Sequence, residues 1–344
     1  EKGFVVEDKV RIAASAVGLP KFKLRADYDK ATEGANDRPW RGMDISTPQG
    51  ALDFSVLMQK HFYEGMATQS RDANQNFIPE KNSDRYWCHM PWLNVGAAGR
   101  EAIHGMTNER PLKPSAIYPD ATEGSDWGIG FYNAVACRQL EKVFGTIDNP
   151  KETPDWSQAN FPDGSVSVKI LFTTADFPGL QGAFTWKGNV SLAMSNSRAI
   201  REVRHLQMDI AVKDSTLTGT QNGYRNWMMT TYYYDAGYRS PIRMANLPEG
   251  LKRMRPVGQQ TGFDVPSSII FEGAQTNQTG GRLNGPADNP RSSCLGCHAT
   301  AGTRKAMAPG VMSHDEWLAI ASDNLDFSQQ LALAKKNIET RRRR

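Results

Sequence analysis

The sequence predicts an α+β fold, in which an antiparallel β-sheet follows a helical and irregular N-terminal region. Three runs of alternating residues, rich in β-branched and aromatic side chains, indicate strands at 161–174, 202–213 and 227–236. No long helical pattern lies between these runs, so they favour antiparallel pairing over parallel βαβ units. One or two helices are predicted after the sheet, at residues 315–339.

The length of the chain and a change of pattern near residue 150 predict two domains. The chain has 344 residues, and a single domain commonly contains about 150. Strand-like alternation begins soon after residue 150, whereas the preceding segment shows loops and helical patterns. We therefore expect a helical and irregular N-terminal lobe at residues 1–150 and a β-rich domain at residues 151–344.

Two helices are predicted within the N-terminal lobe. The first spans residues 46–66, where Ser46 or Thr47 can cap the helix and a proline follows in the first turn. The second spans residues 126–145, where apolar side chains recur near helical spacing. Gly145 can end this second helix in a left-handed conformation.

Charge and hydropathy exclude some partners. The net charge of +4 equals the contribution of Arg341, Arg342, Arg343 and Arg344. The remaining chain has no cluster of Lys and Arg of the kind that nucleic-acid-binding faces carry, so we predict no nucleic-acid partner. We expect the arginine tail to be a solvated end, with docking on an acidic partner or on lipid head groups as the alternative.

The sequence predicts no transmembrane segment. No apolar run approaches the ~20 residues that a membrane-spanning helix needs. The chain opens with Glu1-Lys2-Gly3-Phe4 rather than with the basic and apolar regions of a signal peptide. We expect that an export signal has already been removed from this numbering.

The segment 292–302, SSCLGCHATAG, contains the most specific motif of the chain. Cys-x-x-Cys-His is the signature of covalent c-type haem attachment, in which both thiols add to the porphyrin and the histidine becomes the proximal iron ligand. The motif predicts thioether bonds from Cys294 and Cys297 and iron ligation by His298. It occurs once, so we expect one haem c and no multihaem arrangement.

Two other uses of a Cys-x-x-Cys pair fit less well. A zinc ribbon needs a second pair of Cys or His ligands, but Cys88 and Cys137 are far apart in the sequence. A thioredoxin-like site follows a strand and does not require the adjacent histidine. Haem attachment is therefore the favoured interpretation.

The remaining two cysteines bear on the cellular compartment. Cys88 and Cys137 form an even pair in a chain whose cofactor is normally attached outside the cytoplasm. A disulfide between them is one interpretation, and two buried thiols that pack as small apolar groups is the other. The haem motif predicts a periplasmic or otherwise extracytoplasmic protein.

The order of a β-rich region followed by a haem motif resembles the cytochrome P460 and cytochrome c′-β family. The resemblance rests on FPDGSVSVK at residues 161–169, which is similar to the Pro-Asp-Gly strand entry of that family, and on the motif at 294–298. It covers at most about residues 150–314 and implies an antiparallel sheet with the haem motif near its C-terminal end. Some members carry a lysine crosslinked to the porphyrin, and Lys169 falls in the resembling strand.

The distal side of the haem has several candidate ligands. Met307 and Met312 follow His298 by nine and fourteen residues, and nine extended residues reach about 30 Å. Met307 is the stronger candidate, and ordinary packing is the alternative for both methionines. His89 is a rival because Trp87 and Trp92 could wall a haem pocket, although these tryptophans could equally pack between the lobe and the sheet.

The other histidines are expected to be hydrogen-bonded structural residues rather than ligands; they are His61, His104, His205 and His314.

These observations predict an exported monohaem cytochrome c that transfers electrons to a redox partner, as a carrier or as the haem subunit of a larger assembly. The family resemblance implies an alternative. In that alternative the chain is a haem-dependent oxidoreductase or a sensor that binds hydroxylamine, nitric oxide or peroxide at an open iron position. A structural role, with the N-terminal lobe as an assembly surface, is disfavoured by the covalent cofactor.

Overall fold

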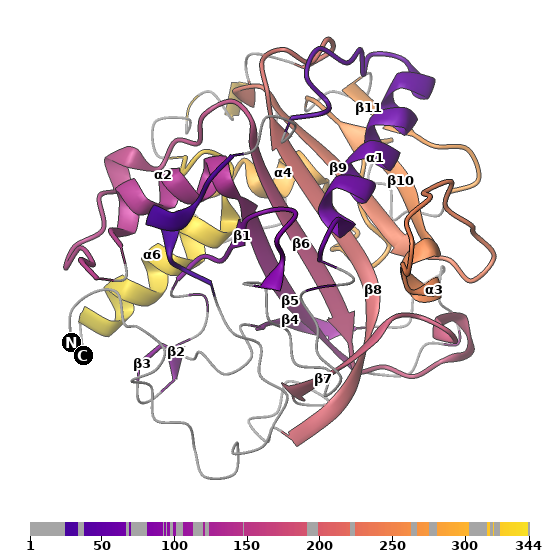
Figure 1. The fold of residues 1–344 in the computed structure, drawn as a ribbon, viewed down its shortest axis with the longest axis horizontal. Coiled ribbons are helices and arrows are strands. Elements are labelled where there is room, and N and C mark those ends of the chain that lie inside the picture. The colour runs from indigo at the N-terminus through magenta and orange to yellow at the C-terminus, as the bar shows by residue number, and fades with distance from the viewer. Residues whose placement is uncertain are drawn as a thin grey trace.

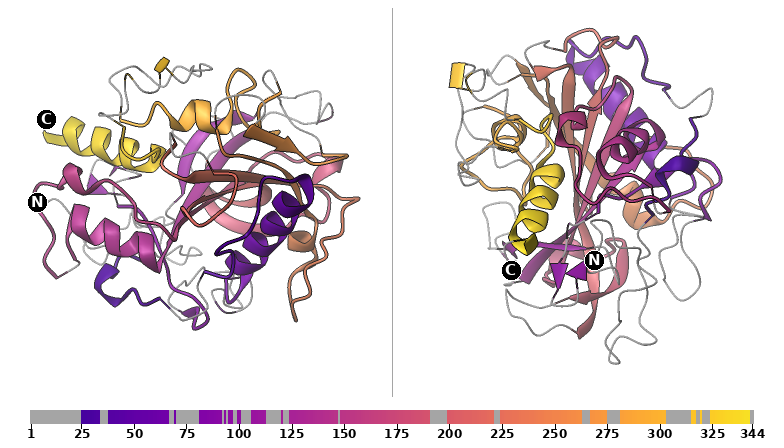
Figure 2. Two further views of the ribbon diagram at one scale, coloured as in Figure 1. Left: turned by 90° about the horizontal axis from the view of Figure 1, so that it is seen from above. Right: turned by 90° about the vertical axis from the view of Figure 1, so that its left-hand side faces the viewer.

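The computed structural model describes residues 25–33, 38–66, 69, 81–91, 93, 95–96, 99–100, 106–112, 120, 124–146, 148–190, 199–220, 224–262, 267–274, 281–302, 315–316, 319 and 324–342. Within them, a large antiparallel β-sheet forms the centre of the molecule, and helices lie on both of its faces (Figures 1 and 2). The fold is therefore mixed α and β, as the sequence predicts.

The main sheet has nine strands in the order β1-β5-β6-β8-β9-β10-β11, with β4 paired to β5 and β7 paired to β8. All of these pairs are antiparallel. The strands are β1 (Trp87–Cys88), β4 (Thr107–Leu112), β5 (Gly124–Asn133), β6 (Ser165–Thr173), β7 (Thr185–Val190), β8 (Ala199–Lys213), β9 (Trp227–Tyr234), β10 (Met254–Gln260) and β11 (Ser268–Ile270). A separate pair joins β2 (Val95–Gly96) and β3 (Gly99–Arg100).

The three predicted strands are confirmed and form the middle of the sheet. They correspond to β6, β8 and β9, which are neighbours in the sheet. The antiparallel register runs from Ser165↔Lys213 to Thr173↔Arg204 between β6 and β8. The prediction of antiparallel rather than parallel pairing was therefore correct.

The predicted helix at 126–145 is wrong in its first half. Residues up to Asn133 form strand β5, and helix α2 (Ala134–Phe144) begins only after it. Every residue of β5 is buried, and a strand covered on both faces has no alternation to distinguish it from a helix. The predicted end is confirmed, because Gly145 follows α2 with a φ of 82°.

The sheet includes strands from both sides of residue 150. β1, β4 and β5 precede this position, and β5 pairs with β6 from Asp126↔Thr173 to Tyr132↔Ser167. The helical and irregular lobe is therefore not seen as a separate body among the described residues. The boundary between residues 150 and 151 stays a prediction.

Helix α1 (Pro48–Tyr63) covers one face of the sheet (Figure 2). Thr47 is the residue that caps it, since its side chain accepts a hydrogen bond from the amide of Gly50. Ser55 fixes the helix to β9: its hydroxyl lies 3.0 Å from that of Thr230, and its carbonyl accepts a bond from Tyr232. This helix confirms the prediction for residues 46–66.

The opposite face is covered by α4 (Cys294–His298) and α6 (Gln329–Arg342), as Figure 2 shows. Leu331 and Ile338 of α6 are buried in one apolar cluster with Leu295 of α4 and with Trp227 and Met229 of β9. The terminal helix is confirmed in α6, and residues 315, 316 and 319, at the start of the predicted range, are also helical. The other described helices are α3 (Glu249–Lys252) and short 3-10 turns at Tyr28–Lys30, Trp156–Gln158 and Pro178–Leu180.

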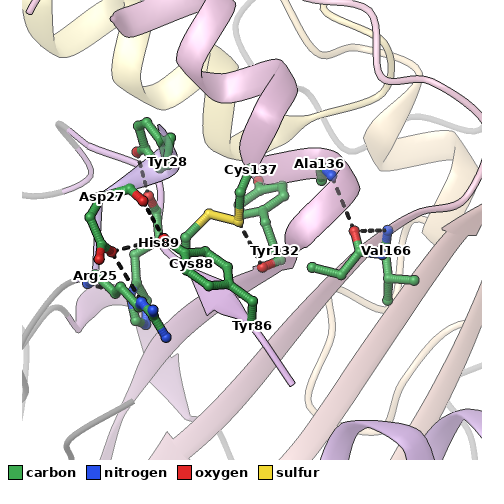
Figure 3. The surroundings of a disulfide bond; sticks show 11 residues. Arg25, Asp27, Tyr28, Tyr86, Cys88, His89, Tyr132, Ala136, Cys137 and Val166 are labelled. Atoms are coloured by element: carbon green, nitrogen blue, oxygen red, sulfur yellow. Dashed lines mark hydrogen bonds and ion pairs between the residues drawn. A yellow bond between two sulfur atoms is a disulfide. The ribbon is translucent and has the colours of Figure 1, made fainter. Parts of the chain in front are cut away.

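Cys88 and Cys137 form a disulfide, which confirms the predicted pair (Figure 3). It joins β1 to α2, with the two Cα atoms 6.1 Å apart. Both cysteines are completely buried. Disulfides persist in oxidising compartments, so this bond supports an extracytoplasmic location. None of the described helices has the length and apolar character needed to cross a membrane.

We expect reduction of this disulfide to destabilise the protein substantially. The bond joins residues 49 positions apart, and a loop of that size corresponds to a stabilisation of about 4 kcal/mol in the chain-entropy description. Urea unfolding of the Cys88→Ala, Cys137→Ala variant measures the loss. The direct check is the intact mass after alkylation without reductant. Alkylation of both Cys88 and Cys137 under these conditions would contradict the disulfide.

Candidate haem-attachment site

The Cys-x-x-Cys-His motif forms a short helix whose first turn is fixed by side chains. The Ser293 hydroxyl caps α4 by accepting a hydrogen bond from the amide of Gly296. The amide of Cys294 donates to the carbonyl of Leu283, and the amide of Leu295 donates to the buried side chain of Gln260 on β10. The free N–H groups of the helix start are thus satisfied, and the motif is attached to the sheet.

The helix places its reactive side chains on one side and its apolar side chains on the other. Leu295 and Ala299 are completely buried, whereas Cys294, Cys297 and His298 are partly exposed. Residues three apart lie on the same side of a helix, and neither Cys294 nor Cys297 is in a disulfide. This donor set fits the attachment of one porphyrin edge with the histidine directly after it.

A hydrogen bond fixes the tautomer of His298. Its Nδ1 lies 2.6 Å from the carbonyl oxygen of Phe327. A carbonyl can only accept, so the proton is on Nδ1 and the lone pair is on Nε2. Burial lowers the pKa of His298 against the opposing effect of this bond. The imidazole is therefore neutral at pH 7 and presents Nε2, which is the form that iron binds.

The segment that supplies this carbonyl is attached to the C-terminal end of α4. The Asn324 side chain donates to the carbonyl of Ala299 at 2.9 Å, and the amide of Leu325 donates to the carbonyl of Ala301 at 3.1 Å. Gln329 at the start of α6 donates to the carbonyl of Cys297 at 2.5 Å. These bonds satisfy carbonyls that a helix end leaves free. Sequence reasoning missed this segment, because no motif marks it.

A row of polar residues crosses the sheet beside the motif. The strand registers align Gly130 of β5, Lys169 of β6, Asp209 of β8 and Thr231 of β9. The Thr231 hydroxyl lies 3.7 Å from the sulfur of Cys294 and donates to Asp209 at 2.9 Å. Cys294 therefore contacts a polar group of the sheet as well as the apolar clusters that it packs against.

Two carboxylates in this region share one partner. The Gln207 side-chain amide donates to Asp209 at 3.1 Å and to Asp288 at 2.8 Å. Burial and the neighbouring charge of Asp288 together raise the pKa of Asp209 to about 7, although Lys169 acts in the opposite direction. Sequence reasoning did not single out this pair; polar residues at 207 and 209 in an apolar strand were the available signal.

Lys169 lies close enough to the motif to influence it. Its ammonium group forms an ion pair with Glu109 at 3.1 Å, and both side chains are about one-quarter exposed. The positive charge of Lys169 lowers the pKa of His298. The lysine that the family resemblance pointed to is therefore beside the candidate site.

The structure gives no position for the two methionines that the sequence offers as distal ligands, because both lie outside the described residues. These methionines are Met307 and Met312, and His104, His314 and Trp92 also lie outside the described residues.

His89 lies beside the disulfide (Figure 3). Its ring packs against that of Phe131 in a tilted arrangement, with a centroid distance of 4.9 Å. Its Nδ1 accepts a hydrogen bond from the backbone amide of Arg25. Phe131 itself packs against Phe62 of α1, on the face opposite α4. His89 and Trp87 therefore belong to the packing on that side of the sheet.

His61 and His205 are buried structural residues. His61 packs edge-on against Trp40 and Trp87, and His205 packs on Phe172. Burial lowers the pKa of each to about 3, so both are neutral at physiological pH. No described contact joins either of them to α4. Among the described residues, no cluster of three or more His, Cys, Asp or Glu could hold a metal ion.

We expect Asp209 to make the protein less stable as the pH rises. Its pKa is about 7 in the folded chain and near 3.8 when unfolded, so the folded state binds more protons between these values. Stability should fall from about pH 4 to pH 7. Asp209→Asn should flatten this dependence and raise the free energy of unfolding at pH 8 by about 1–3 kcal/mol. Urea unfolding at several pH values measures both effects, with the exposed Asp53→Asn as control. An unchanged pH profile in Asp209→Asn would contradict the assignment.

Comparison of the chain with protein-family models, curated proteins and solved structures finds no match. The functional argument therefore depends on the residues and geometry of this chain.

Proposed function

We propose that the chain is an exported c-type monohaem protein that transfers electrons, as a carrier or as the haem subunit of a larger redox assembly. The observation that carries the proposal is the arrangement of His298, whose Nδ1 proton is held by the Phe327 carbonyl. His298 directly follows a Cys-x-x-Cys pair whose cysteines form no disulfide. A dithiol redox site does not need a histidine prepared in this way.

The residues of α4 have distinct roles in this proposal. Cys294 and Cys297 would hold the porphyrin by thioether bonds, and His298 Nε2 would bind the iron. The haem supplies one-electron chemistry and an iron position for a ligand. The chain contributes the tautomer of His298, its orientation, and the polar environment of Asp209 and Lys169.

Partial exposure of the motif supports electron transfer in particular. Both thiols and His298 are partly exposed, so the attached edge of the porphyrin would lie near the protein surface. Electron transfer to a partner needs a short distance between donor and acceptor. A porphyrin edge attached near the surface can come close to the partner without any opening of the fold.

The second candidate is an enzyme or sensor of the P460 type that binds a small ligand at an open iron position. It is favoured by the ionisable groups beside the motif, namely the Asp209 and Asp288 pair and the Lys169 and Glu109 pair. Carboxyl groups with a pKa near neutrality are typical of sites that exchange protons with a substrate. Hydroxylamine, nitric oxide and peroxide are the ligands that the family resemblance implies.

Covalent haem is the first test of the proposal. Haem staining after denaturing electrophoresis should show the cofactor on the chain, and Cys294→Ala, Cys297→Ala should lose it. The buried pair is the matched control, because Cys88→Ala, Cys137→Ala removes two cysteines but should keep the stain. Haem that acidic acetone extracts from the unmutated protein would refute the assignment.

Carbon monoxide binding distinguishes the two candidates. An open iron position binds carbon monoxide without losing a protein ligand, whereas a fixed His/Met pair must first dissociate. Electron transfer through a fixed His/Met pair predicts low-spin spectra in both states, no carbon monoxide adduct, and loss of a near-infrared band in Met307→Ala. The P460-type candidate predicts instead that the ferrous protein binds carbon monoxide readily, that the oxidised protein shows a high-spin component, and that Met307→Ala leaves the spectrum almost unchanged.

A further inference from the structure

The carbonyl that holds His298 is directed by an unusual turn. Asp326 and Phe327 have φ values of 51° and 63°, which lie in the left-handed region that side chains other than glycine disfavour. A side chain in this conformation crowds its own backbone, which costs free energy. Two such residues in succession persist where surrounding contacts determine the backbone more strongly than local preference does.

The strongest of these contacts is made by the carboxylate of Asp326. This side chain is completely buried, and it forms an ion pair at 2.9 Å with Lys213, whose side chain is 8% exposed. It also accepts a hydrogen bond from the amide of Phe161 at 2.7 Å, and Arg225 lies 3.6 Å away. Lys213 is the last residue of β8. The end of a central strand therefore anchors the turn.

Phe327, the residue after Asp326, is held by contacts of its own. The Phe327 side chain is buried against Tyr224, with ring centroids 6.1 Å apart, and its amide donates to the Asn324 side chain at 2.6 Å. These contacts leave the Phe327 carbonyl directed at His298 Nδ1. A continuous series of contacts therefore connects Lys213 at the end of β8 to Asp326, and then through the adjacent Phe327 to His298.

Stability alone is a poor explanation for this ion pair. Removing two charges from water costs several kcal/mol, and a buried ion pair often stabilises a fold no more than apolar residues of the same size. A buried ion pair does, however, hold its two charged groups in one relative position. An imidazole whose Nδ1–H donates to a fixed acceptor is held in one orientation and becomes a more basic ligand.

We propose that the Asp326 and Lys213 ion pair is a positioning element, which holds the Phe327 carbonyl on His298 Nδ1 and so sets the orientation and basicity of the proximal imidazole. The inference rests on the proposed haem attachment. A more basic imidazole stabilises ferric iron, so loss of the anchor should raise the reduction potential.

Two substitutions separate positioning from simple charge. Asp326→Asn removes a negative charge, which by Coulomb's law alone favours the reduced iron and raises the potential. Lys213→Met removes a positive charge, which alone lowers it. If both residues act through the Phe327 carbonyl, both variants should raise the potential. The sign of the Lys213→Met shift is therefore decisive.

The experiment is redox titration of the haem-loaded protein, together with NMR measurement of the exchange of the His298 Nδ1 proton. We expect both variants to keep one haem per chain. At the midpoint potential of the unmutated protein, the ratio of oxidised to reduced iron should fall by roughly tenfold, which is about 59 mV for a one-electron couple. The Nδ1 proton should exchange faster in both.

Two controls accompany these variants. Lys213→Arg keeps the ion pair and should keep the potential. Glu141→Gln breaks the exposed ion pair with Arg138 on α2 and should change neither readout.

Opposite shifts in Asp326→Asn and Lys213→Met, or unchanged potential and proton exchange in both, would overturn the inference while leaving haem attachment intact. Absence of haem from the unmutated protein would overturn both proposals together. If Asp326→Asn does not fold, a lowered potential in Lys213→Met is sufficient to refute the positioning role.

Discussion

The central strands of this protein must be shielded from water on both faces, and the rest of the architecture follows from that constraint. All residues of β5 and of β9 are buried, so neither face of the sheet can be left to solvent. Helix α1 covers one face, while α4 and α6 cover the other (Figure 2). The haem motif is therefore part of the layer that completes the core.

This position explains why polar groups are concentrated near the motif. Buried polar groups need partners, because an unpaired one costs free energy that a water-exposed one does not. On the α4 side, Gln207 joins two carboxylates, and Lys213 pairs with Asp326. Each arrangement gives its buried groups partners, and the first also brings the charge of Asp288 to the surroundings of His298. Packing and electrostatics at the site are consequently coupled.

Electron transfer and small-ligand binding share the same proximal arrangement. Both require Cys294, Cys297 and a neutral His298, and both benefit from a rigid acceptor for its Nδ1 proton. They differ physically at the sixth position of the iron, since a protein ligand there must leave before an exogenous ligand can bind. Under the second proposal, the carboxyl pair near Cys294 would exchange protons with the bound ligand.

The sequence by itself determined the local features of this protein. Alternation predicted β6, β8 and β9, the cap and proline predicted α1, and the spacing of Cys294, Cys297 and His298 predicted the candidate site. These features depend on residues close together in the chain, where a period or a motif is visible. The prediction failed at residues 126–133, because a strand buried on both faces carries no period of its own.

Tertiary structure decided everything that depends on long-range contact. The register of three strands places Lys169, Asp209 and Thr231 in one row. Contacts between distant segments bring Phe327 to His298 and Asp326 to Lys213. No local pattern records such contacts, because each partner is an ordinary polar or apolar residue in its own segment. The three motif residues are a property of the sequence, whereas the environment that tunes them is produced only by folding.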